Sequence, residues 1–345
     1  MSTTSPHLSP VPRDLVPKAR PKYVRTLVIL LVLGGLLYFS LRDAPFIEIW
    51  NALKQLRLSQ IGILFVINGM VVLAMTARWW IIVRADNPSV PFLPLIRYRL
   101  AVFGLSYFTP GPQVGGEPLQ AFYLKHNHGL SFARATSAVI MDKLLEFLAN
   151  FILIGAGLTA AIRVGMISRN GAQALGSLVP MAVILLWPVI HLLLLRRGRY
   201  PVSGLLRFAG PRIGNPAWVR LIIVSERMAA SFTRRKLPAL LGALFFSLAA
   251  WGGMAAEYFL MADFLNVHLD FEQILAALTA ALLAFLMPLP GGLGALEASQ
   301  VYALTTMGYA SSIGISLSLL MRARDILNGG VGLLLAGKFV RDIGR

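Results

Sequence analysis

The sequence predicts an all-α, polytopic integral membrane protein, and three observations support that fold class. Hydrophobic residues make up 57% of the chain and charged residues only 14%, with a mean hydropathy of +0.69, whereas soluble domains are about one quarter charged. Most of the apolar residues lie in runs long enough to cross a bilayer, which takes about 20 residues. The 32 Lys and Arg residues lie mainly between those runs. A net charge of +17 therefore indicates topology control and contact with anionic lipid rather than a nucleic-acid partner.

About six full spans are expected, within a transmembrane domain over residues 23–340. Residues 1–22 are rich in Ser, Pro and basic groups and are expected to form a disordered cytoplasmic tail. The first span, 26–41, lacks a small-residue cleavage site and is expected to be an uncleaved signal anchor. The other spans are expected over residues 60–83, 135–162, 172–195, 237–262 and 311–337.

Two further apolar stretches, 95–109 and 273–290, run into clusters of proline and glycine. Residues 110–118 read PGPQVGGEP and residues 288–294 read PLPGGLG. Proline interrupts the helical hydrogen bonds and glycine permits positive φ, so neither cluster suits a helix interior. Irregular backbone at membrane depth persists only where protein buries it or where it lines a wet cavity. These stretches therefore predict two re-entrant helical hairpins.

The distribution of Lys and Arg predicts the topology. With the N-terminus in the cytoplasm, 23 basic residues fall in cytoplasmic segments and five in external ones, as the positive-inside rule requires. Ten of them lie in the loop 196–236, whose basic residues are expected to control the topology. The alternative is that much of this loop forms amphipathic helix on the membrane surface. The remaining four basic residues fall within spans. Both termini are thus expected on the cytoplasmic side of the cell inner membrane.

The same topology suggests an inverted repeat, because the two hairpins enter from opposite sides of the membrane. The repeat units are expected over about 60–162 and 237–338. Two oppositely oriented units with broken helices at matching places are typical of transporters. An offset of 180 residues places Asp142 opposite Arg322 and superposes Pro110 on Pro290, Gly111 on Gly291, Glu117 on Glu297, Gln120 on Gln300 and Met141 on Met321.

The Pro/Gly clusters are candidate binding elements. Each is followed by a short helix whose free N–H groups and positive dipole end can hold a phosphate or carboxylate. The structural alternative is a kink in which each glutamate merely caps its helix. The expected substrate-binding residues are Gly111, Gly115, Gly116, Glu117, Gln120, Gly291, Gly292, Gly294, Glu297, Gln300 and Arg322.

Ionisable residues within the spans form the second candidate group, since a charge near the bilayer centre requires a partner or a cavity. Asp142, Lys143 and Glu146 share one helix face. We expect Arg322 to neutralise an anionic headgroup, with Arg324 and Asp325 beside it, while Asp142 and Glu146 balance Lys143 or couple to protons. The structural alternative is a buried ion pair in which Asp142 meets Arg322.

Other residues have simpler interpretations. Glu257 is expected to be interfacial. Trp79 and Trp80, beside Arg78 and Arg84, are expected to form an aromatic belt anchor. The chain has no cysteine, and its histidines lack the partners of a metal site. No nucleotide-hydrolysis or hydrolase motif is present, so no catalytic residue, metal or cofactor is expected.

The sequence resembles the lysylphosphatidylglycerol synthase transmembrane region, also called the flippase-like domain family. The residues that carry the resemblance are 109–117, 290–297 and the pair Asp142-Lys143. The resemblance covers about residues 24–340. It implies translocation of a polar lipid between leaflets, without synthesis, because the soluble aminoacyltransferase domain of the full-length synthases has no counterpart here. Family members often carry Glu-Arg where this chain has Asp142-Lys143, and lysine lacks the bidentate fork of arginine.

The sequence thus predicts a translocator of an anionic phospholipid or a lipid-linked headgroup, with membrane lipids and a separate lipid-modifying synthase as its partners. One alternative is an intramembrane lipid-modifying enzyme that uses Glu117 or Glu297 as general base. The other is a membrane scaffold that recruits envelope-lipid enzymes through the loop 196–236.

Overall fold

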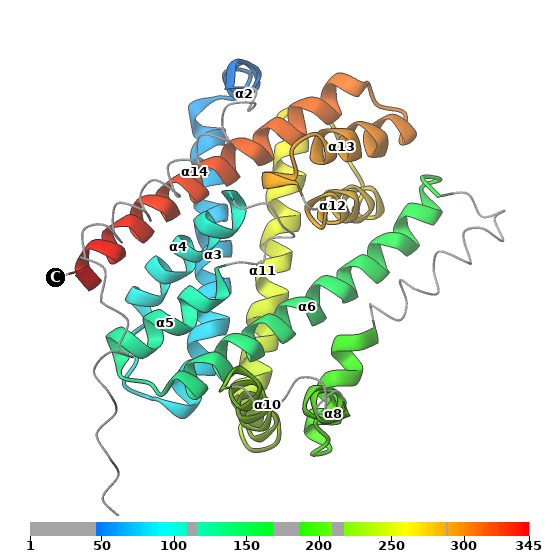
Figure 1. Ribbon diagram of the computed structural model, residues 1–345. Helices are drawn as coiled ribbons and strands as arrows, with labels where there is room; N and C mark the ends of the chain where they lie inside the picture. The colour runs from blue at the N-terminus through cyan, green and yellow to red at the C-terminus, as the bar shows by residue number, and fades with distance from the viewer. Residues whose placement is uncertain (1–45, 109–115, 168–185, 209–216, 288, 345) are drawn as a thin grey trace, which may run out of the picture.

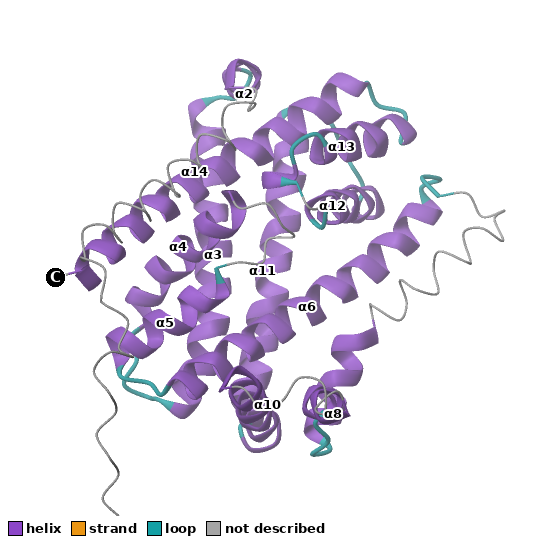
Figure 2. Cartoon of the chain, viewed as in Figure 1, coloured by secondary structure: helices purple, strands orange, loops and turns teal. Residues whose placement is uncertain are grey.

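In this computed structural model, the structure describes residues 46–108, 116–167, 186–208, 217–287 and 289–344. Every regular element in the described residues is a helix, which confirms the predicted all-α fold (Figure 2). The expected tail 1–22 and first span 26–41 lie outside it. The helices are α2 (Phe46–Lys54), α3 (Leu58–Asp86), α4 (Phe92–Phe108), α5 (Glu117–His128), α6 (Phe132–Arg163), α8 (Pro201–Phe208), α10 (Ala217–Arg235), α11 (Leu237–Phe264), α12 (Phe271–Phe285), α13 (Ala295–Thr306) and α14 (Ser311–Gly344).

Three helices of the described part are long and apolar enough to cross a membrane: α3 with 29 residues, α6 with 32 and α11 with 28. They confirm the spans expected over 60–83, 135–162 and 237–262, and the chain is an integral membrane protein. The 34 residues of α14 also exceed the length of a span, but charged side chains interrupt its apolar sequence. Of the span expected over 172–195, the helix Leu186–Arg196 is described.

The helices fall into two runs of four with the same order: long, short, short, long. The first run is α3 to α6 and the second is α11 to α14 (Figure 1). The two runs interlock, since α3 packs on α11, α4 packs on α14 and α12 packs on α6. Exchanging the two runs leaves this set of contacts unchanged.

The second Pro/Gly cluster breaks the helix as predicted. Helix α12 ends at Phe285, the short 3₁₀ turn η2 spans Pro290–Gly292, and α13 begins at Ala295. Gly291, Gly292 and Gly294 have φ values of 55°, 63° and 76°, in the left-handed region that glycine adopts without strain. This turn packs on α4, where a Cβ at Gly291 would lie 2.8 Å from the Tyr107 ring. The first apex, 109–115, lies outside the described residues.

Glycine also permits the close packing of α4 on α14. A Cβ at Gly104 would lie 2.5 Å from the Gly329 carbonyl oxygen, and one at Gly332 would lie 2.0 Å from the Leu100 carbonyl oxygen. Small residues allow two membrane helices to bring their backbones together, and dispersion contacts then stabilise the pair. The contact fixes α4 and α14 side by side.

The loop 196–236 contains the helices α8 and α10. Figure 1 shows both at one end of the bundle, with α2 at the other. Glu226 on α10 accepts hydrogen bonds from the backbone N–H groups of Val202 (2.8 Å) and Ser203 (2.7 Å) at the start of α8. This buried carboxylate satisfies free donors of the helix N-terminus and joins the two helices. Helix α2 was not predicted, since it lies between the spans expected over 26–41 and 60–83.

Candidate functional site

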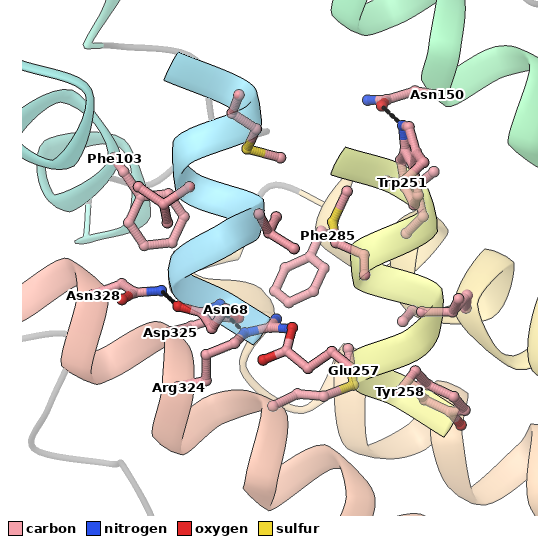
Figure 3. Close-up of a pocket in the computed structure, with 18 of the residues that line it drawn as sticks. Asn68, Phe103, Asn150, Trp251, Glu257, Tyr258, Phe285, Arg324, Asp325 and Asn328 are labelled. Atoms are coloured by element: carbon pink, nitrogen blue, oxygen red, sulfur yellow. Dashed lines mark hydrogen bonds and ion pairs between the residues drawn. The ribbon is translucent and has the colours of Figure 1, made fainter. Parts of the chain in front are cut away.

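A cavity of about 220 Å³ lies where the two runs of helices cross. Helices α3, α4, α6, α11, α12 and α14 all contribute to its wall. Most of the wall is apolar, with side chains such as Phe103 and Phe285 (Figure 3). The polar side chains that line it are Asn68, Arg99, Glu146, Asn150, Glu257, Arg324, Asp325 and Asn328.

On one side of the cavity, two arginines hold two carboxylates. Arg78 on α3 bonds Asp142 (Nε–Oδ1, 2.7 Å) and Glu146 (Nη2–Oε2, 2.7 Å). Arg99 on α4 bonds the same two residues of α6, at 2.6 Å to Asp142 and 3.2 Å to Glu146. Asp142 is fully buried, so these bonds supply the compensation that a charge away from water requires.

Lys143 extends this network to the first hairpin. Its ammonium nitrogen lies 3.1 Å from Glu117 Oε1 and 3.0 Å from Glu146 Oε1. Glu117 is the first residue of α5, where a negative charge also interacts favourably with the helix dipole. We call these residues the α6 cluster: Arg78, Arg99, Glu117, Asp142, Lys143 and Glu146.

A second network lies on α14. Arg322 forms an ion pair with Glu297, in the first turn of α13, and donates to the Gly291 carbonyl oxygen at 3.3 Å. Arg324 pairs with Glu257 on α11 (Nη1–Oε2, 2.8 Å) and with Asp325 (Nε–Oδ1, 2.9 Å). We call these five charged residues the α14 cluster. Beside it, the Asn328 amide donates to Asn68 Oδ1 at 2.9 Å.

The two clusters occupy equivalent positions in the two runs. Lys143 lies 11 residues after Phe132, the first residue of α6, and Arg322 lies 11 residues after Ser311, the first residue of α14. Each pairs with a glutamate at the start of the preceding short helix. The two hairpins are therefore attached to their long helices by the same kind of ion pair.

A further pair of equivalent positions carries opposite charges. Arg78 lies 20 residues after Leu58, the first residue of α3, and Glu257 lies 20 residues after Leu237, the first residue of α11. The arginine on α3 binds acids of α6, whereas the glutamate on α11 binds an arginine of α14.

The expected contact between Asp142 and Arg322 is wrong. Asp142 pairs with Arg78 and Arg99, and Arg322 pairs with Glu297. The offset of 180 fits the Pro/Gly clusters, but the first residues of the long helices are 179 apart. One residue turns a helix by about 100°, so an error of one residue assigns a side chain to another face.

The structure separates the remaining predicted residues into different roles. Gln300 is fully buried, accepts from the Tyr258 hydroxyl at 2.7 Å and donates to the Ala277 carbonyl oxygen at 3.1 Å. Gln120 is also buried, and the Gly116 amide donates to Ser106 Oγ at 3.0 Å. Gly116, Gln120 and Gln300 do not line the cavity. Gly111 and Gly115 lie outside the described residues.

The predicted headgroup residue Arg322 is 2% exposed and is not among the residues that line the cavity. The expected interfacial position of Glu257 is also wrong, because its side chain is 1% exposed and lines the cavity. Likewise Arg78 and Trp79 are 2% and 0% exposed, so they are buried and do not form an interfacial anchor. The burial of these polar side chains could not be predicted, because a sequence does not show which neighbouring helix packs over them.

Four polar residues of the cavity wall had no predicted role: Asn68, Arg99, Asn150 and Asn328. Two of these asparagines carried a signal, because Asn150 follows Glu146 by four residues and Asn328 follows Arg324 by four. Residues at that spacing share one helix face, so polar pairs inside two spans indicated a polar surface. No group of three His, Asp or Glu side chains in the described part of the chain is arranged to hold a metal ion.

Comparison with known proteins places the chain in a family. The sequence model described as lysylphosphatidylglycerol synthase TM region matches residues 26–329. A UPF0104 membrane protein of Pyrococcus horikoshii is 22% identical over 268 residues, 73% of this chain and 78% of that protein. A UPF0104 membrane protein of Methanothermobacter thermautotrophicus is 31% identical over 107 residues, 30% of each chain. No solved structure matches. The chain therefore belongs to the family of the lysylphosphatidylglycerol synthase TM region.

Proposed function

We propose that this protein translocates the anionic headgroup of a phospholipid or lipid-linked compound across the cytoplasmic membrane. The observation that carries the proposal is the cavity at the crossing of the two runs, where Arg99 and Arg324 reach an otherwise largely apolar space. The interface of two repeats is where many transporters bind their substrates. Family membership and the broken helices support the same reading.

The headgroup contact is assigned to Arg324, with Arg99 across the cavity, in place of Arg322. The side chains of Arg324 and Arg99 are 20% and 14% exposed, whereas that of Arg322 is 2% exposed. A planar guanidinium can bind two phosphate oxygens at once, and a site shielded from bulk water strengthens that bond. The acyl chains remain in lipid, so the cavity has to hold only the headgroup.

The partners proposed with this function are membrane lipids and a separate enzyme that makes the translocated lipid. The loop 196–236, with ten Lys and Arg residues, contains α8 and α10 at one end of the bundle (Figure 1). We assign that end to the cytoplasm by the positive-inside rule.

Neither glutamate of the general-base alternative lines the cavity. Glu117 is paired with Lys143 and Glu297 with Arg322. A general base must be free to take a proton from a substrate within hydrogen-bond reach, so this geometry favours translocation.

The test is lipid exchange in liposomes that contain the purified protein, with fluorescent anionic and zwitterionic lipids and dithionite to quench the outer leaflet. Arg324→Lys keeps the charge but removes the bidentate fork. We expect it to slow exchange of the anionic lipid about 10-fold or more, since a hydrogen bond to a charged group contributes about 1.5–3 kcal/mol.

Arg163→Lys is the matched control, because Arg163 is a surface residue with a side chain that is 60% exposed. It should exchange lipid at the wild-type rate. Thermal unfolding in detergent shows whether Arg324→Lys stays folded. A folded Arg324→Lys protein with wild-type exchange would refute the assignment, and an inactive wild-type protein would count against translocation itself.

A further inference from the structure

The α14 cluster contains one more carboxylate than it has basic groups. Arg322 is matched by Glu297, but Arg324 is shared by Glu257 and Asp325. The α6 cluster is balanced, since three basic side chains face three carboxylates. Both clusters place one glutamate at a helix N-terminus, so helix dipoles do not remove the difference. Among the described residues, the group Glu257–Arg324–Asp325 therefore carries a formal charge of −1.

An unmatched negative charge in a site shielded from water is unfavourable, and a buried carboxyl group normally relieves it by taking up a proton. Glu257 is the more suitable of the two acids. Its side chain is 1% exposed, against 8% for Asp325. Its Oε1 atom is buried and makes no hydrogen bond of standard geometry. Asn68 is the polar neighbour of this carboxyl group on α3. Asp325 directly follows Arg324, which donates to it.

We propose that Glu257 is a proton-binding site, and that its protonation is coupled to binding of the anionic headgroup. This inference rests on the translocation proposed above. When Glu257 is charged, it occupies the Nη1 side of Arg324. When Glu257 is neutral, that side of the guanidinium becomes available to a phosphate in the cavity. Proton and headgroup therefore each favour the binding of the other, and such coupling is reciprocal.

The surroundings of Glu257 support a proton rather than a metal ion. From α14 it faces Arg324 and Asp325, and from α3 it faces Asn68 (Figure 3). Helix α12 contributes apolar side chains to the cavity. The remaining charged residues of the cavity wall, Arg99 and Glu146, belong to the balanced α6 cluster. No described set of three acidic or histidine side chains could hold a cation there.

Charge balance explains why the proton moves with the headgroup. A headgroup phosphate that entered beside charged Glu257 and Asp325 would place three negative charges around Arg324. Protonation of Glu257 reduces them to two. We therefore expect one proton to be taken up with each headgroup and released with it, without any covalent step.

The first test is direct and needs no transport. Infrared spectra of the protein in membranes that contain anionic lipid, at neutral pH, should show the C=O stretch of a protonated carboxylic acid, which shifts in D₂O. Glu257→Gln should lose this band. The control Glu272→Gln should keep it, because Glu272 is a surface residue paired with Arg163. If the wild-type protein lacks the band, or if Glu257→Gln retains it, the proton site is refuted.

The second test imposes a pH gradient on liposomes that contain anionic fluorescent lipid. The wild-type protein and Glu272→Gln should enrich the lipid in one leaflet, and the rate should change by up to about tenfold per pH unit, the limit for one proton. Glu257→Gln should not respond to the gradient. A Glu257→Gln protein that still follows the gradient would overturn the coupling. Failure of the wild-type protein to exchange any lipid would instead refute the proposed function, while the infrared band would still decide the proton site.

Discussion

Replacing Gly332 with alanine tests the packing that holds the two sides of the cavity together. Helix α4 carries Arg99 and α14 carries Arg324, and these helices pack through glycine. A Cβ at Gly332 would lie 2.0 Å from the Leu100 carbonyl oxygen and 3.0 Å from the Gly104 nitrogen. These atoms belong to the backbone of α4, so no side-chain rotation can relieve the clash.

The magnitude follows from this distance. Ordinary van der Waals contact requires about 3.5 Å, so the two helices have to separate by about 1.5 Å near Gly332. Such overpacking costs about 1–3 kcal/mol. Alanine in place of glycine in a helix interior stabilises the folded state by about 0.5–1 kcal/mol, because the unfolded chain has less conformational entropy. The net expectation is a loss of about 1 kcal/mol of stability, within a range of about 0 to 2.5 kcal/mol.

The matched control is Gly330→Ala, on the same helix, where a Cβ would meet nothing within 4 Å. Gly330→Ala should be stabilised by the entropy effect and should cause no clash, so the two substitutions should change stability in opposite directions. The assay is thermal or denaturant unfolding of each purified variant in detergent, followed by size-exclusion chromatography. If Gly332→Ala unfolded at or above the temperature of Gly330→Ala, the close α4–α14 contact would be refuted.

Two further predictions concern buried or half-buried polar groups. Arg78→Met should destabilise the protein by about 3 kcal/mol. This is near the lower end for the loss of one partner from a buried pair, because Asp142 retains Arg99. Unfolding in denaturant measures the loss, and an unchanged midpoint would contradict the buried network. Burial lowers the pKa of His128 at the end of α5, so its contribution to stability is present at neutral pH and is lost as the pH falls below about 6.5. The melting temperature should therefore fall less on acidification in His128→Gln than in the wild-type protein, and equal slopes would exclude this role.

The long helices could be predicted from sequence because lipid leaves few choices. A run of apolar residues at membrane depth must form a helix, since every backbone donor and acceptor has to be satisfied within the segment. Residues 237–262 were predicted as a span, and α11 covers Leu237–Phe264. The helix break at Gly291 was predictable for a related reason, because prolines and glycines with positive φ cannot continue a helix.

The partners of the charged residues could not be predicted with the same rules. Sequence spacing fixes which residues share a helix face, but not which other helix that face meets. Asp142, Lys143 and Glu146 were correctly grouped on one face. Arg78, which pairs with Asp142 and Glu146, was instead assigned to the membrane interface. Glu257 was misplaced in the same way, since α14 covers it from a part of the chain 67 residues away.

The two runs of helices carry similar ion pairs at equivalent positions. Lys143–Glu117 and Arg322–Glu297 attach the two hairpins at matching places, so the ion pairs that hold the hairpins do not distinguish the two sides of the membrane. Near-equal stability of the two arrangements is what a protein needs if its site is to open alternately to either side. The asymmetry lies instead at the cavity, where Glu257 stands at the position of Arg78. If the protein translocates a headgroup as proposed, a proton at Glu257 is well placed to decide which of two similar arrangements holds it.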